Sequence, residues 1–199
     1  MERPGDVCAS QGMITPRADR SNVNNSTRKA DRATVTFFDG LSIDGYMMPN
    51  GEFRVSMSGA SILLGFAPNW LGRTLSRGGT AVKALQGLGF SGQTEKLVAR
   101  SINGGGTTAD TISLKDLQRI LIYGVQQNKP QAIALQMALT NMALTDFFRD
   151  AFGLRALSID EKRNQFYAAY AATLTAKDWQ EWDRMEAQEI DDHLRFLEA

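Results

Sequence analysis

Residues 34–55 read Thr-Val-Thr-Phe-Phe-Asp-Gly-Leu-Ser-Ile-Asp-Gly-Tyr-Met-Met-Pro-Asn-Gly-Glu-Phe-Arg-Val. Short runs rich in β-branched and aromatic residues, such as Thr-Val-Thr-Phe-Phe, are typical of β-strands. Pro49-Asn50-Gly51 lies between two apolar runs and predicts a hairpin turn, because Asn and Gly accept a positive φ. We therefore expect a small antiparallel sheet at the start of the folded part.

Short helices follow the sheet. Serine and asparagine caps and glycine stops predict helices over residues 56–64 and 69–76, and a third helical stretch covers residues 81–88. Leu97-Val98 within residues 93–100 predicts a further strand, and the glycine-rich stretch 103–106 predicts a loop that ends this half of the chain.

The second half is helical in pattern. Ser113 can cap a helix with apolar residues at helical spacing, and Pro130 opens a long helix that Gly153 stops. Ser158-Ile-Asp-Glu161 is a capping box for a helix through Leu174, and Thr175-Ala-Lys-Asp178 can start a last one. The fold class is therefore α+β: a small antiparallel sheet with short helices, followed by a largely α-helical half.

The chain divides into three parts. Residues 1–33 contain almost no large apolar groups and predict a flexible tail, although its basic residues could also form an arm that reaches phosphate. Residues 34–152 are the predicted main domain. Residues 156–199 are a predicted helical pair whose tryptophans and leucines need a cover, either the domain's own core or a second copy in a homodimer.

The cysteine content and the lack of long apolar runs predict where in the cell the protein is found. The 199 residues include a single cysteine, Cys8, which excludes an internal disulfide and a cysteine-based zinc site. No apolar run approaches the roughly 18 residues that cross a bilayer, and the first residues lack a secretory apolar region. We expect a cytoplasmic protein without membrane contact.

Motifs of catalysis are missing. The one histidine, His193, lies in an acidic helix with no cysteine or second histidine nearby to share a metal, and Gly104-Gly-Gly106 is followed by Thr-Thr, not by the Lys-Ser/Thr of a phosphate loop. Carboxylates of the basic region lack a nuclease spacing. We predict no enzyme, no catalytic or metal-binding residue and no small-molecule cofactor.

The net charge of zero hides an asymmetry. Six basic residues stand against one acid between residues 53 and 106, whereas eight acids stand against two arginines from residue 178 onward. Asn69, Arg73 and Arg77 are spaced by four and so project from one side of a helix, while Trp70 and Leu71 can turn to the core. Such a face can place guanidinium groups on phosphates or guanine edges, although an ordinary solvated helix has the same pattern.

Two blocks of the chain resemble a known family. Asp44-Gly-Tyr46, Phe53-Arg-Val-Ser56, residues 60–65 and Asn69-Trp-Leu71 look like the strand, helix and glycine-ended turn of Bro-N and KilA-N domains. Residues 112–124 and Asn128-Lys-Pro-Gln-Ala-Ile-Ala-Leu135 are similar to the second half of Bro-N, with a longer spacing between the blocks.

The resemblance covers residues 40–151 and implies a DNA-binding module of phages, DNA viruses or mobile elements that regulates transcription. It places contacts near Arg54, Asn69, Arg73 and Arg77. The full set of predicted DNA-binding residues is Arg54, Asn69, Arg73, Arg77, Lys83, Lys96 and Arg100.

Two other functions stay open at this point. One is a protein-interaction or scaffold module that acts through its helical C-terminal half, and the other is an atypical metal-dependent nuclease. DNA, and a second copy bound through the C-terminal helices, are the expected partners.

Overall fold

The computed structural model describes residues 28–99, 107–181 and 184. In chain order its elements are β1 (Arg28–Phe38), β2 (Leu41–Met47), β3 (Phe53–Ser56), α1 (Met57–Leu63), α2 (Trp70–Arg77), α3 (Thr80–Gly87), β4 (Glu95–Ala99), β5 (Thr107–Ser113), α4 (Leu114–Gln126), α5 (Pro130–Ala151) and α6 (Ile159–Ala171). The predicted α+β class is confirmed, with the strands in the first half and the long helices in the second.

The five strands close into a barrel in the order β1-β2-β3-β5-β4. Four neighbouring pairs are antiparallel, and the barrel closes where Arg28, Lys29 and Ala30 of β1 run parallel to β4. The parallel closure and the strand β5 were not predicted. β5 was missed although three of its residues are β-branched threonines, because Ile112 is its one large apolar residue and no apolar alternation marks the strand.

The prediction of a tail through residue 33 is wrong for residues 28–33, which form the first half of β1. These residues are mostly polar, but residues 28–30 pair with β4 and residues 31–33 pair with β2, so backbone hydrogen bonds hold them in the sheet. Ala30 packs in a small core with Tyr46, Met48 and Leu97. The rest of the predicted tail, residues 1–27, lies outside the described part.

Local signals place the helix starts. Ser56 Oγ accepts the Gly59 N–H at 3.1 Å, and Ser113 Oγ accepts the Asp116 N–H at 3.1 Å. Ser158 and Glu161 form the predicted capping box of α6. That helix ends at Ala171, a few residues before the predicted Leu174, and residues 176–181 are again helical.

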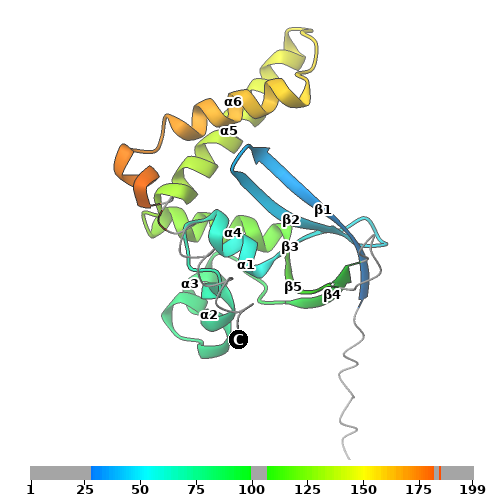
Figure 1. Ribbon diagram of the computed structural model, residues 1–199, viewed down its shortest axis with the longest axis vertical. Helices are drawn as coiled ribbons and strands as arrows, with labels where there is room; N and C mark the ends of the chain where they lie inside the picture. The colour runs from blue at the N-terminus through cyan, green and yellow to red at the C-terminus, as the bar shows by residue number, and fades with distance from the viewer. Residues whose placement is uncertain (1–27, 100–106, 182–183, 185–199) are drawn as a thin grey trace, which may run out of the picture.

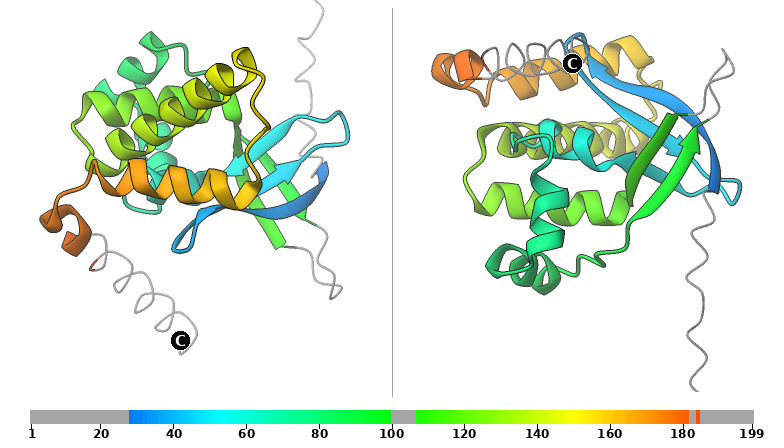
Figure 2. Two further views of the ribbon diagram at one scale, coloured as in Figure 1. Left: turned by 90° about the horizontal axis from the view of Figure 1, so that it is seen from above. Right: turned by 60° about the horizontal axis from the view of Figure 1, so that its bottom comes forward.

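The helices cover the barrel as two layers. α1 and α4 lie beside the strands (Figures 1 and 2). α5 packs on α4, and α6 packs on α5. Phe166 and Tyr170 of α6 pack on Phe37 and Phe38 of β1, with ring centroids 5.3 Å apart for Phe37–Phe166 and 5.4 Å apart for Phe38–Tyr170. α6 therefore belongs to the same core as residues 34–152, and its apolar face is covered by the chain itself.

No helix in the described part of the chain combines the length and the apolar character that spanning a bilayer requires.

Candidate nucleic-acid interface

Aromatic packing fixes α2 on the body of the protein. The Trp70 ring stacks on Phe66 at a centroid distance of 3.9 Å and lies 5.8 Å from the Tyr123 ring of α4. Leu71 is fully buried, and Leu75 packs against the same core. The predicted division of this helix is confirmed, since its apolar side chains face inward and its polar side chains face solvent.

The outer side of α2 carries Asn69, Arg73 and Arg77, and all three are exposed. Asn69 precedes the first turn without capping it by its side chain, so its amide is not used by the helix. Within the described residues, the Arg73 and Arg77 guanidinium groups take part in no ion pair or side-chain hydrogen bond. Both groups are thus open to an external acceptor.

These side chains line one wall of a groove of about 640 Å³. The opposite wall comes from the barrel, where β1, β2 and β5 contribute charged side chains, and Ser58 of α1 adds a hydroxyl-bearing side chain between them. The charged lining residues are Arg32, Asp44, Arg73, Arg77 and Asp110. The groove is open to solvent, and its three arginines outnumber its two aspartates.

On the barrel wall, Arg32 is held in an ion pair. Arg32 binds Asp44 in a fork, with Nε–Oδ1 at 3.0 Å and Nη2 at 2.9 and 3.0 Å from the two carboxylate oxygens. Hydrogen bonding to Asp44 raises the pKa of Arg32 above its ordinary value. Asp110 lies opposite Lys96 in the β4–β5 register. The unpaired positive charge of the groove is therefore concentrated on α2.

Tyr46 forms part of the lining below this pair. Burial raises the pKa of its hydroxyl, and the nearby Asp44 carboxylate raises it further. The phenol is consequently neutral at physiological pH and can serve the groove as a hydrogen-bonding group, not as a charge.

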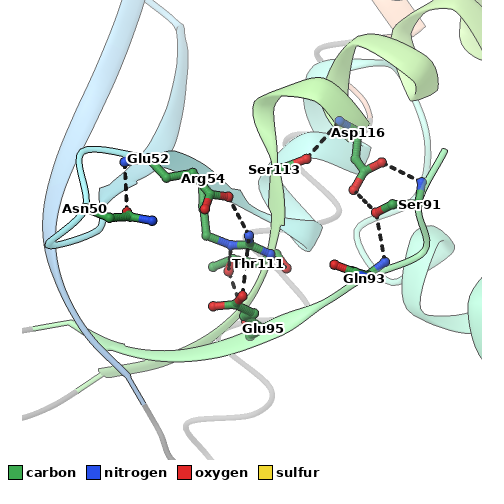
Figure 3. A network of polar contacts seen from close by, with 9 residues as sticks. All are labelled: Asn50, Glu52, Arg54, Ser91, Gln93, Glu95, Thr111, Ser113 and Asp116. Carbon is green, nitrogen blue, oxygen red and sulfur yellow. Dashed lines mark hydrogen bonds and ion pairs between the residues drawn. The ribbon is translucent and has the colours of Figure 1, made fainter. Parts of the chain in front are cut away.

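The expectation that Arg54 contacts DNA is corrected by its position inside the barrel (Figure 3). Its Nε donates to Thr111 Oγ1 at 3.1 Å, its Nη2 donates to Thr111 O at 3.3 Å, and its Nη1 lies 2.8 Å from Glu52 Oε1 and 3.8 Å from Glu95 Oε1. The residue is 4% exposed. Arg54 ties β3 to β5 and β4, and its guanidinium group is buried among these strands, away from the surface.

The other predicted basic residues are scattered. Lys83 on α3 and Lys96 on β4 are exposed, but neither lines the groove. Arg100 lies outside the described residues. The structure thus brings together Asn69, Arg73 and Arg77 of the predicted set.

Sequence reasoning missed two features of the groove. Arg32 was placed in the predicted tail because the apolar stretch begins only at Thr34. Thr34 lies in the middle of β1, so the strand starts several residues before the apolar stretch does. Asp110 was missed because β5 shows no alternation of apolar and polar residues in the sequence. Among the described residues, no group of three His, Cys, Asp or Glu side chains gathers where it could hold a metal ion.

Comparison with known proteins adds no assignment, since the chain matches no protein-family model, no curated protein and no solved structure.

Proposed function

We propose that the protein binds DNA through the exposed face of α2, as a regulator of the phage or mobile-element type. The observation that carries the proposal is the pair of arginines four residues apart, Arg73 and Arg77, on a helix whose inner side is fixed by Trp70 and Leu71. Guanidinium groups in this setting are suited to phosphate oxygens and to the O6 and N7 acceptors of guanine.

Rigidity of the helix supports this reading. A short helix in isolation would not hold its shape, whereas the stacked rings of Phe66, Trp70 and Tyr123 hold α2 in one orientation. The two side chains are then presented from a fixed backbone, which lowers the entropy that binding must overcome.

The acidic residues of the barrel wall limit how far bound DNA can enter the groove. Asp44 and Asp110 would repel a phosphate backbone that lay deep in it, and Arg32 offsets Asp44 alone. The proposed contact therefore follows the rim formed by α2. Asn69 adds an amide that can pair with an adenine edge or with a phosphate.

The resemblance of residues 40–151 to Bro-N and KilA-N domains leads to the same helix. The resemblance also implied a DNA contact for Arg54, but this residue is buried and binds other barrel residues. Homodimerisation, cytoplasmic location and the absence of catalytic activity stay part of this proposal.

Binding to random double-stranded DNA at two salt concentrations tests the proposal. Phosphate-driven binding falls steeply between roughly 50 and 200 mM salt. The variant Arg73→Ala with Arg77→Ala should bind more weakly at the lower salt. A matched variant, Lys115→Ala with Lys177→Ala, removes two exposed cations that do not line the groove and should bind like the parent protein.

The nuclease alternative has its own test. Supercoiled DNA incubated with the protein and Mg²⁺ or Mn²⁺ should stay intact, as it does with a chelator. Metal-dependent nicking that copurifies with the protein would replace the binding proposal with a catalytic one.

A further inference from the structure

The end of α5 exposes large apolar side chains that the fold leaves uncovered. Phe147, Phe148 and Phe152 are 75%, 63% and 77% exposed. Leu144, Phe148, Phe152 and Leu154 line a shallow groove of about 270 Å³. We call these five residues the α5 patch.

The spacing of the α5 patch is that of a helix packing face. Leu144, Phe148 and Phe152 recur every four residues, and Phe147 lies beside them, so all four side chains cover one side of the last two turns. Exposed Met137 lies seven residues before Leu144 on the same side. No charged residue occurs in α5 before Asp146, so most of this face carries no charge. Such a stripe is typical of a helix that packs on another helix.

The apolar area is larger than a monomer usually leaves in water. At 150–250 Å² for each ring, the three phenylalanines alone expose roughly 400 Å². Leu144, Leu154 and Ile159 are each more than half exposed and extend this area toward the roughly 800 Å² that each partner contributes to a standard interface.

The charges around the α5 patch are balanced. Four acids stand against four bases between residues 146 and 163: Asp146, Asp150, Asp160 and Glu161 against Arg149, Arg155, Lys162 and Arg163. Lys162 Nζ lies 2.7 Å from Asp146 Oδ2, Arg155 is paired with Glu161, and Arg149 donates to the Arg155 carbonyl at 2.8 Å. A two-fold interface brings the same rim together twice, so a neutral rim avoids self-repulsion. Nucleic acid or an anionic lipid surface would instead favour a net positive rim.

The described residues that follow α6 lead away from the patch. α6 begins at Ile159, close in sequence to the patch, and runs for 13 residues, about 20 Å of helix, before it ends at Ala171 (Figure 1). Residues 172–181 continue from that far end.

From the spacing, area and charge balance, we infer that the α5 patch binds the α5 patch of a second copy of this chain, as a two-fold helix pair. The interface lies on α5, whereas the sequence alone suggested residues 156–199. It is independent of the DNA proposal, because α2 lies at the opposite end of the molecule (Figures 1 and 2).

The test measures the molar mass of the full chain by light scattering after size exclusion, over a range of concentrations above micromolar. We expect the mass of two chains for the parent protein and of one chain for Phe147→Glu with Phe148→Glu. Phe53→Glu, which alters a 55% exposed phenylalanine on β3, should stay dimeric. A parent protein that is monomeric throughout would overturn the inference, as would a dimer that survives both glutamates.

A second measurement covers the case in which the glutamate variant fails to fold. In a Cys8→Ser background, Leu144→Cys should form a disulfide between two copies on mild oxidation, whereas Val35→Cys, an exposed site on β1, should not. Equal cross-linking at both sites, or none at Leu144→Cys, contradicts the helix pair. Flotation of the parent protein with neutral vesicles in place of dimer formation would assign the patch to a lipid surface and overturn the inference.

Discussion

The outer face of α2 and the end of α5 are both exposed helix surfaces, but they differ in chemistry. On α2 two unpaired arginines project and Leu71 is buried, whereas at the end of α5 Asp146 is paired with Lys162 and three phenylalanines project. A surface that keeps free cations in water is suited to an anionic partner, and one that keeps rings in water is suited to an apolar partner. The contrast indicates two separate binding surfaces on one small fold.

The largest expected effect tests whether the arginines of α2 are free of a structural role, by comparing exposed Arg73 with buried Arg54. Arg54→Met removes the donors that hold Thr111 and faces Glu52 and Glu95, so we expect a loss of about 3 kcal/mol in the free energy of unfolding. Arg73→Met should change it by less than about 0.5 kcal/mol. Urea unfolding followed by circular dichroism measures both. Equal losses would mean that Arg73 also has a structural role.

The two surfaces should respond independently to substitution. We expect Phe147→Glu with Phe148→Glu to abolish the dimer and leave the affinity of each protomer for a short DNA duplex unchanged within about twofold. Arg73→Ala with Arg77→Ala should leave the dimer intact. Fluorescence anisotropy and light scattering on the same samples give both readings. A loss of both properties in either variant would mean that the surfaces act as one.

The paired charges beside the α5 patch predict a small effect of pH. Arg155 and the Ser158 cap lower the pKa of Glu161 to about 2. A carboxyl group whose pKa is lowered in the folded state stabilises the protein above its unfolded pKa, about 4.3. That stabilisation is lost as the pH falls from there toward 2.

The check is a series of thermal melts across this pH range. As the pH falls, the Tm of the parent protein should decrease more than the Tm of Glu161→Gln. The two curves of Tm against pH should therefore converge at the acid end. A constant difference between them at every pH would show that the capping box acts through shape and not through charge.

Local features of the fold were predictable from the sequence. Ser56, Ser113 and Ser158 cap the helices they precede, because a cap depends on neighbours within three residues. Asn69, Arg73 and Arg77 could be placed on one face for the same reason: helical spacing is a local property. The inward side of α2 followed from Trp70 and Leu71.

Long-range features were not predictable. Phe53-Arg-Val55 suggests an outward Arg54 by alternation, yet Phe53 is exposed and Arg54 is buried. Its main partner, Thr111, lies 57 residues later, on a strand with one large apolar residue. Arg32 lines the groove because β1 extends upstream of Thr34 and pairs there with β2, where Asp44 binds it. Partners on other strands decide the positions of these arginines, and no local pattern contains them.

The central claim is that α2 carries the DNA contact, and the salt dependence of binding tests it most directly. Each phosphate contact contributes about 0.9 to the slope of log K against log salt, so Arg73→Ala with Arg77→Ala should reduce the slope by about 2 and weaken binding at least about tenfold at low salt. The Lys115→Ala, Lys177→Ala control should keep the parent slope. No binding by the parent protein at about 50 mM salt, or an unchanged slope in the α2 variant, would contradict the account.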